Sequence, residues 1–398
     1  MSSNNIKQFW CFRRIKINKI EINCDHTMTI VELAPDNRYL PICSCCGQKV
    51  KSIHSIQKRY IRDLPMAQTI TLLQLTYRKV KCQKCGIRIE YIGFVHPYSR
   101  VTNRFANYIF NLCQYMTVND AANHVKLSWD QVKLIDKLEL KKRHKEPNLK
   151  DVKFICMDEI SIFKHHKYLT IIANYLTGQV IGVVKNRDFG SLYNFLNTLP
   201  VQVLSNIKSV AMDMWDPYIK AINTLCPKAL IIFDRFHVIS SFNKVIDKVR
   251  NQEYRNASKE EKNLMKRSRF LLLKNAANLN KNEKPRLKEI LNQNQLLAKV
   301  YILKEYLKRL WQYIYQTWAK KFLQYWCELA YETCCIYLKN FANMLIKYQY
   351  GIINHCKFKI NNAKLEGINN KIKVIKRKAY GYLDIEYFGF KIMQATSN

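Results

Sequence analysis

Acidic side chains are scarce in this sequence. Its 398 residues include 30 Asp and Glu against 66 Lys and Arg, which gives a formal net charge of +36. So large an excess of positive charge repels itself in a compact protein and is most readily tolerated beside a polyanion. A general drift toward lysine would explain the many cations, but it would not explain the few acids. The charge balance therefore predicts contact with nucleic acid.

Long apolar runs are also missing. A membrane-spanning helix needs about 20 consecutive apolar residues, and lysines interrupt the most apolar stretch, 300–353. Residues 1–19 lack the unbroken apolar core and the small-residue cleavage site of a signal peptide. We therefore expect a cytoplasmic protein without membrane contact. In that reducing compartment the 14 cysteines are expected to be thiols or metal ligands rather than disulfides.

Two cysteine motifs stand out in the first hundred residues. Each has the form Cys-x-x-Cys-Gly, with Cys43 and Cys46 in the first and Cys82 and Cys85 in the second. Such a turn directs two thiolates at one point, and together the two turns supply the four ligands of one tetrahedral structural zinc ion. Cys45 is expected to lie outside this site. The gap between the motifs requires a strand or hairpin, and a strand is predicted at 69–77. Buried free cysteines in a small β-rich domain are the alternative.

The segment 117–132 has the spacing of a helix-turn-helix. Ala121 and Ala122 are small enough for close helix contact, and Ser128 with Gln131 forms a capping box that opens the second helix. The residues of that helix expected to contact DNA are Trp129, Gln131 and Lys133. An ordinary helical hairpin is the alternative, because the segment has no diagnostic residue. The second helix is predicted to end near residue 137, and the charged stretch 141–150 is the predicted linker.

A mixed α/β region is predicted after this linker. Its strands are expected at 152–158, 168–175, 179–184, 207–213 and 229–234. Three strands followed by alternating helices and strands indicate a mixed sheet with covered faces. Residues 236–356 then have a helical pattern almost throughout. One apolar stripe within them, expected to be helical-bundle core, consists of Leu303, Leu307, Leu310, Ile314 and Trp318.

Asp158 and Asp213 each end a predicted strand, and Glu366 opens a predicted helix. Three acids that converge in a basic protein are best explained by hard divalent cations such as Mg²⁺. Two such ions can activate the attacking oxygen and stabilise the leaving oxygen in phosphoryl transfer. Glu159 is the alternative to Asp158. Strand alternation places these two side chains on opposite faces of the sheet, so either acid could serve.

The sequences around these acids form four blocks. They are Met-Asp-Glu at 157–159, Met-Asp-Met-Trp-Asp-Pro-Tyr at 212–218, Phe-Asp-Arg-Phe-His-Val at 233–238, and Glu-Gly-Ile-Asn-Asn-Lys-Ile-Lys at 366–373, followed by Arg377 and Tyr380-Gly381-Tyr382. In order and content these blocks resemble the DDE transposases of the insertion-sequence L-three (ISL-three) family. The resemblance extends over essentially the whole chain, including the cysteine motifs and the helix-turn-helix segment.

The resemblance implies a transposase whose catalytic residues are Asp158, Asp213 and Glu366, holding two Mg²⁺ or Mn²⁺ ions. It implies cleavage and strand transfer on double-stranded DNA at the terminal inverted repeats of an insertion sequence, without a covalent enzyme–DNA intermediate. We expect a homo-oligomer on DNA in the bacterial nucleoid. An inactive or repurposed transposase acting as a DNA-binding regulator is the main alternative, and a structure-selective nuclease of the same fold is a second.

Residues near the acids have expected supporting roles. His237 is expected to be a packed, hydrogen-bonded residue rather than a metal ligand, and Asp234 to pair with Arg235 or His237. Cations that follow Glu366 are expected to hold the DNA backbone, where they offset phosphate charge. These cations are Lys371, Lys373, Lys376, Arg377 and Lys378.

We therefore expect a multidomain α+β protein in five parts. A zinc-ribbon-like, β-rich domain occupies 1–100 and a helix-turn-helix region occupies 101–142. A ribonuclease-H-like α/β core, implied by the resemblance, begins at 151–250. A long helical insertion follows at 251–357, and the C-terminal part of the core, with Glu366, occupies 358–398.

Overall fold

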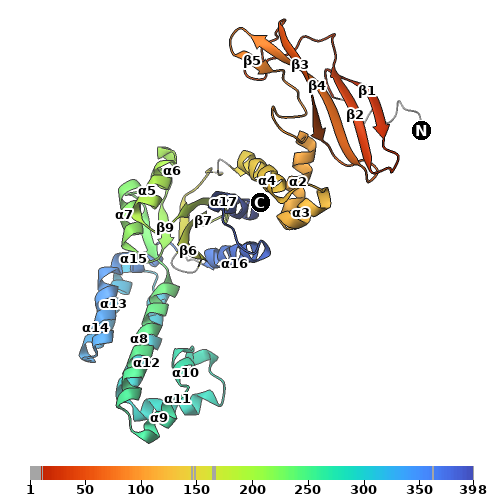
Figure 1. The fold of residues 1–398 in the computed structure, drawn as a ribbon. Helices are drawn as coiled ribbons and strands as arrows, with labels where there is room; N and C mark the ends of the chain where they lie inside the picture. The colour runs from red at the N-terminus through yellow and green to blue at the C-terminus, as the bar shows by residue number, and fades with distance from the viewer. Residues whose placement is uncertain are drawn as a thin grey trace. The chain divides into compact units, whose positions relative to one another are not determined.

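A computed structural model describes residues 10, 12–144, 147, 149–163, 167–360 and 363–397 (Figure 1). The chain divides into two compact units, Met1–Lys145 and Glu146–Asn398. Part of the predicted linker, and most of the first ten residues considered for a signal peptide, lie outside the described residues. In the described part of the chain, every helix is too short or too polar to cross a bilayer.

The first unit is built on one five-stranded sheet. The strand order is β1-β2-β4-β3, with β5 paired to β4, and only the β2–β4 pair is parallel. The predicted strand at 69–77 is the first part of β4, in which alternate residues such as Leu73 and Leu75 are fully buried. The strands are β1 (Ile15–Ile22), β2 (Met28–Pro35), β3 (Ile53–Arg62), β4 (Ile70–Cys82) and β5 (Gly86–Ile89).

Three helices complete this unit: α2 (Asn103–Tyr115), α3 (Val118–Val125) and α4 (Trp129–His144). The prediction that the last helix ends near residue 137 is wrong, and its final turn occupies the beginning of the predicted linker. The helix continues because its buried stripe continues, with Val132, Asp136 and Leu140 each four residues apart. Ala121 and Ala122 are buried where α3 packs against α4, as predicted.

The second unit contains a mixed sheet with the order β10-β9-β6-β7-β8. β10, β9 and β6 are parallel, whereas β6, β7 and β8 form an antiparallel meander. The predicted mixed sheet is therefore confirmed. Its strands are β6 (Phe154–Phe163), β7 (Lys167–Asn174), β8 (Val180–Lys185), β9 (Ser209–Met212) and β10 (Leu230–Phe233). The first predicted strand was too short: β6 runs past Asp158 because its pairing with β7 continues, with Asp158 opposite Ile171.

Alternate residues of β6 enter different cores. Ile155 and Met157 pack into one core, with α5 (Phe189–Asn197), α6 (Val201–Asn206) and α7 (Asp216–Leu225). Cys156 and Ile160 pack into the other core, with α16 (Ala363–Lys378) and α17 (Ile385–Thr396). The sheet therefore has helices on both faces, and Figure 1 shows α16 and α17 beside β6 and β7.

A helical region lies between β10 and α16. Its first helix, α8 (Arg235–Asn256), is long and packs against α12 (Gln295–Leu307) and α14 (Ile336–Lys347). The aromatic rings of Phe242, Trp326 and Phe341 meet edge to face in the core of this region. The α-helices are α8 (Arg235–Asn256), α9 (Lys259–Met265), α10 (Arg269–Leu273), α11 (Glu283–Gln293), α12 (Gln295–Leu307), α13 (Gln316–Glu332), α14 (Ile336–Lys347) and α15 (Gln349–Ile353). Short 3₁₀ turns occur at Ala276–Asn278, Lys308–Gln312 and Asn354–Cys356.

The predicted apolar stripe of this region is only partly core. Leu303, Leu307 and Leu310 are buried, but Ile314 and Trp318 are 62% and 59% exposed. The stripe does not belong to one helix, because the chain becomes extended at Tyr313 and α13 begins at Gln316.

Candidate active site and metal centres

The four cysteines of the two motifs converge at one point. The sulfur atoms of Cys43, Cys46, Cys82 and Cys85 all lie within 4.8 Å of one another. The β3–β4 hairpin carries the chain between the motifs, and the second motif is the turn that joins β4 to β5. The glycine after each motif has the left-handed backbone that such a turn requires, with φ of 72° at Gly47 and 73° at Gly86. Cys45 is exposed and outside the group.

The surroundings of Cys43 favour a thiolate. Burial raises the pKa of this thiol, but backbone N–H groups of Cys46 and Cys45 donate to its sulfur and lower the pKa to about 7. The thiolate is the form that binds metal. Four soft sulfur donors at one point fit a structural zinc ion, as the spacing of the motifs predicted.

The helix-turn-helix segment carries the predicted DNA-contacting residues in the first two turns of α4. The capping box is present, because the backbone N–H of Ser128 donates to the Gln131 side chain at 3.1 Å and the N–H of Gln131 donates back to Ser128 Oγ at 3.3 Å. Trp129 and Gln131 are exposed, and the Lys133 ammonium lies 5.2 Å from the centre of the Trp129 ring. Arg62 donates to the carbonyl of Val125 at 3.0 Å and so ties the turn to β3.

Sheet register brings Asp158 beside Asp213. The parallel pairing of β6 and β9 sets Phe154 opposite Ser209 and Cys156 opposite Ala211. The same register, continued by two residues, places Asp158 next to Asp213 immediately after β9 ends. Ligand atoms of Asp158, Asp213 and His237 all lie within 4.8 Å of one another. His237 comes from the first turn of α8, directly after the neighbouring strand β10.

The carboxylate oxygens of this group have different partners. Asp158 accepts the backbone N–H of Glu159 at 2.7 Å through Oδ1 and the side-chain amide of Asn369 at 2.6 Å through Oδ2. His237 Nδ1 lies 2.8 Å from Asp213 Oδ2. The other oxygen, Asp213 Oδ1, is buried and has no hydrogen-bond partner among the described residues. A buried carboxylate oxygen without a donor is costly, so this atom is suited to a cation.

The electrostatics of the group also fit a cation. Burial raises the pKa of Asp158, and the adjacent Asp213 carboxylate raises it further. The hydrogen bond from His237 to Asp213 raises the pKa of the imidazole. Two neighbouring carboxylates in a partly buried site repel each other, and a divalent cation between them removes that repulsion.

Glu159 faces the other side of the sheet. Its carboxylate lies 3.2 Å from the Arg187 guanidinium, and burial raises its pKa beside the Tyr218 hydroxyl on α7. Asp234 is buried at the start of α8, and its charge contributes to the raised pKa of His237.

Glu366 does not join the Asp158 group in this structure. Its side chain is exposed in the first turn of α16, and the group of potential metal ligands found in the described residues does not include it. The helix itself is held against Asp158, because Asn369 is one turn further along. Of the predicted DNA-binding cations on α16, Lys371 donates to the carbonyl of Ala395, Lys376 is half-buried, and Lys373, Arg377 and Lys378 are exposed.

Two residues near the acids were missed by the sequence analysis. Asn369 is part of the block around Glu366, and its one-turn spacing from that residue was the available signal. Arg187 had no such signal. Its guanidinium lies 4.1 Å from the centre of the Trp215 ring, and its carbonyl accepts the Trp215 indole N–H at 2.9 Å.

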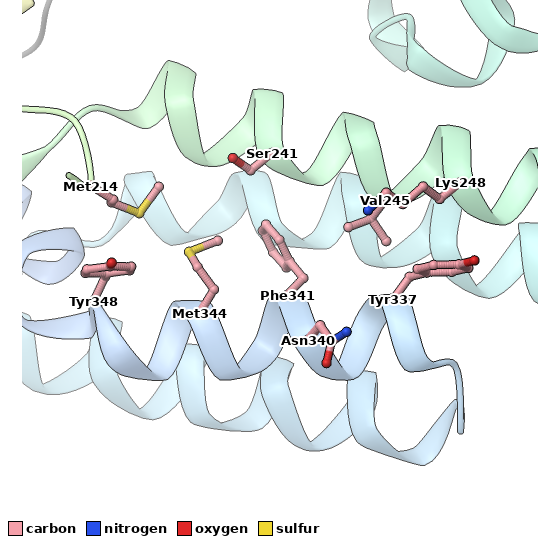
Figure 2. A pocket seen from close by; sticks show the side chains of 9 residues that line it. All are labelled: Met214, Ser241, Val245, Lys248, Tyr337, Asn340, Phe341, Met344 and Tyr348. Atoms are coloured by element: carbon pink, nitrogen blue, oxygen red, sulfur yellow. The ribbon is translucent and has the colours of Figure 1, made fainter. Parts of the chain in front are cut away.

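A pocket between α8 and α14 begins at Met214, the residue after Asp213. Figure 2 shows its side chains facing one another from the two helices, with Val245 and Lys248 on α8 opposite Phe341 and Tyr337 on α14. Its walls are mainly apolar, and its lining includes no carboxylate. The candidate metal ligands therefore lie outside this pocket.

A Cys₄ centre, a helix-turn-helix and an α/β unit with paired aspartates, in that order, are the parts of a DNA-processing protein. Family comparison is consistent with each part. A zinc-finger of transposases IS204/IS1001/IS1096/IS1165 matches residues 40–85, a helix-turn-helix domain of transposase family ISL3 matches 92–137, and a transposase domain of that family matches 155–392. The chain belongs to transposase family ISL3.

Its relatives include transposases of insertion sequences. The chain is 36% identical over 358 residues to the transposase for insertion sequence element IS1001 of Bordetella parapertussis, covering 89% of this chain and 88% of the relative. It is 20% identical over 383 residues to the transposase for insertion sequence element IS1557 of Mycobacterium tuberculosis, covering 90% and 86%. The predicted family resemblance and the helix-turn-helix are thereby confirmed, and the zinc-finger match supports a structural zinc ion at the Cys₄ centre.

Proposed function

We propose that this chain is an active DDE transposase that cleaves double-stranded DNA at the ends of an insertion sequence and joins those ends to target DNA. The observation that carries the proposal is the pairing of Asp158 with Asp213 on adjacent parallel strands, with one buried Asp213 oxygen left without a partner. In a chain of net charge +36, a cation site of this kind suits a phosphodiester substrate.

The sheet supports a ribonuclease-H-like core. Three antiparallel strands are followed by two parallel strands on the other edge of β6, and helices cover both faces. The predicted insertion at 251–357 then contains the end of α8 and the helices α9 to α15. On this basis we retain the five-part division at 1–100, 101–142, 151–250, 251–357 and 358–398.

Asp158, Asp213 and Glu366 would hold two Mg²⁺ or Mn²⁺ ions, which prefer oxygen ligands. Bound ions would activate the attacking oxygen and stabilise the leaving oxygen. Glu366 and Asn369 are three residues apart and lie on the same side of α16, so the helix held at Asp158 also carries the third carboxylate. Asn369 and His237 orient the two aspartates through the hydrogen bonds described above.

The DNA would be held by residues from both units. Trp129, Gln131 and Lys133 on α4 would contact one of its grooves. Exposed Lys373, Arg377 and Lys378 on α16, with Lys371 and Lys376, would contact phosphates near the cations. We further propose that the active species is a homo-oligomer on DNA.

The experiment is a cleavage and joining assay on DNA that carries the element's ends. We expect Asp158→Ala, Asp213→Ala and Glu366→Ala each to abolish cleavage and joining in Mg²⁺, because each removes a metal ligand, while DNA binding persists. Asp216→Ala is the matched control, since Asp216 is an exposed acid three residues from Asp213 that pairs with Lys347, and it should retain activity.

The outcomes separate the alternatives. Near-normal activity of any one of the three variants would refute its catalytic role. Cleavage without joining by the wild-type protein would indicate a nuclease, and end binding without cleavage would indicate a regulator.

A further inference from the structure

The turn between α16 and α17 exposes two large apolar side chains. Tyr380 is 100% exposed and Leu383 is 92% exposed. They follow the last turn of α16, which contains Lys376, Arg377 and Lys378. An exposed aromatic ring therefore lies immediately beyond three cations.

Tyr380 occupies a backbone position that favours glycine. The turn is a complete Schellman motif, because the N–H of Gly381 donates to the carbonyl of Lys376 at 2.9 Å and the N–H of Tyr380 donates to that of Arg377 at 3.0 Å. This pattern makes Tyr380 the left-handed residue, and its φ is 53°. A tyrosine in that conformation costs free energy that a glycine would not. The glycine of this turn, Gly381, comes one position after the left-handed residue.

The fold does not compensate for this cost. A fully exposed ring buries no apolar surface, so packing in the folded chain does not stabilise it. Residues held in sparsely populated backbone conformations cluster at functional sites. We therefore attribute Tyr380 to ligand binding rather than to the stability of the folded chain.

The position of the turn indicates which ligand. α16 is held at Asp158 through Asn369. At a helix rise of about 1.5 Å per residue, Tyr380 is roughly 15 Å from that contact, the length of four or five base pairs. The cations between them suit phosphates.

We propose that Tyr380, assisted by Leu383, is a wedge that enters the DNA a few base pairs from the reacting phosphodiester and stacks on an unpaired base. Proteins that contact the minor groove through Arg and Lys side chains frequently also insert an apolar side chain between base steps, and an aromatic ring stacks on any base. This inference rests on the proposed function, since it assumes that end DNA lies along α16.

The test compares Tyr380→Gly with Tyr380→Phe on paired end DNA and on end DNA with a mismatch four or five base pairs from the cleavage site. Tyr380→Gly should keep or raise the melting temperature, because it places glycine at the left-handed position. It should cleave paired ends about 10-fold more slowly or worse, given the free energy of one base–aromatic stack. The mismatch should restore its rate, because the unpairing is already done. Tyr380→Phe should behave as wild type.

Tyr98→Gly is the matched control. Tyr98 also has a left-handed backbone, with φ of 68°, and is 83% exposed, but it belongs to the first unit. The cleavage rate of Tyr98→Gly should depend on the mismatch no more than the cleavage rate of wild type does. A wild-type cleavage rate for Tyr380→Gly on paired ends would overturn the wedge, and so would slow cleavage by this variant that a mismatch does not restore. A melting temperature of Tyr380→Gly below that of wild type would also overturn it. So would loss of self-association by this variant while its DNA binding stays intact.

Failure of the wedge can be distinguished from failure of the proposed function. 2-Aminopurine placed at the same position in end DNA should change its fluorescence on binding wild type but not Tyr380→Gly, in buffer with Ca²⁺ instead of Mg²⁺. If wild type cleaves but this signal is the same for both proteins, only the wedge is wrong. If wild type never cleaves, the proposed function is wrong, and the fluorescence still decides whether Tyr380 unstacks a base.

Discussion

The two oxygens of Asp213 have opposite surroundings. Oδ2 is 2.8 Å from the Nδ1 of His237, and Oδ1 is buried without a partner among the residues that the structure describes. A hydrogen bond to one oxygen fixes the rotation of the carboxylate and so fixes the direction of the other. The expected hydrogen bond of His237 is present, and we propose that His237 is a positioning residue for Asp213.

This role predicts a difference between two substitutions of His237. An asparagine can place its amide nitrogen close to the position of Nδ1, whereas an alanine leaves Asp213 free to rotate. We expect His237→Ala to require about 10- to 100-fold more Mg²⁺ for cleavage, or to lose that much activity, as is usual when a residue that orients a metal ligand is removed. His237→Asn should recover most of the loss.

The measurement is the cleavage rate as a function of Mg²⁺ concentration, with end-DNA binding as the control for folding. The same Mg²⁺ requirement for His237→Ala and wild type would contradict the positioning role. Equal losses in the two variants would instead indicate that the imidazole itself is a ligand.

The sequence could predict these acids only in part. Alternation along the strand separated Asp158 from Glu159, but it did not tell which face holds the site. The structure distinguishes them by their neighbours: Glu159 meets Arg187, and Asp158 meets Asn369 and Asp213. The contact with Asn369 joins residues 211 positions apart. Such a contact depends on how α16 packs on the sheet, which no local pattern encodes.

At the scale of elements, a buried lysine joins two helices of the insertion. Lys304 on α12 is 2% exposed, and its ammonium donates to the carbonyls of Leu272 and Lys274 at the end of α10, both at 2.8 Å. Glu305 lies 3.1 Å away. The last carbonyls of a helix have no partner within the helix, so the lysine satisfies two of them. Burial nevertheless lowers the pKa of Lys304 to about 8.

This pKa predicts a stability that rises with pH. Between about pH 8 and the ordinary pKa of 10.5, the unfolded chain keeps the Lys304 proton and the folded chain loses it. Unfolding then takes up a proton, so a higher pH favours the folded state, by at most about 1.4 kcal/mol per pH unit. Lys304→Met lacks the group and is the reference. We expect the melting temperature of wild type, relative to Lys304→Met, to rise from pH 8 to pH 10. A constant or falling difference would contradict the lowered pKa.

Elements were more predictable where a strong local pattern existed. The strands β7 and β8 are close to their predicted bounds, because apolar runs and the turn at Gly178 specify them locally. The stripe from Leu303 to Trp318 was misassigned for the opposite reason. Its spacing fits one helix across Tyr313, and only packing against the rest of the insertion decides that the chain turns there and exposes Trp318.

At the scale of the whole molecule, the chain consists of two units that each bury a core of their own. The Cys₄ centre belongs to the first unit, and the paired aspartates belong to the second. Units with separate cores can fold and unfold separately. A metal that stabilises one of them is therefore not expected to stabilise the other.

The last prediction follows from this separation. The Cys₄ centre ties the loop before β3 to the β4–β5 turn, across a gap that the chain spans with a whole hairpin. Removal of zinc by a chelator, or the substitution Cys82→Ser, should therefore loosen residues 40–90 and lower the first unit's melting temperature, because metal binding is part of the folding free energy of such a site. The second unit should remain folded, with protease resistance at 150–397 unchanged. Wild type should contain one zinc ion per chain, and Cys45→Ser, which changes the cysteine outside the group, should keep it.

Loss of zinc should abolish end-specific binding while any residual salt-sensitive binding to arbitrary DNA persists, since the net charge of +36 does not depend on the metal. Simultaneous melting of both units on chelation would show instead that they form one cooperative body, and the zinc ion would then support the catalytic acids as well as the DNA-binding parts.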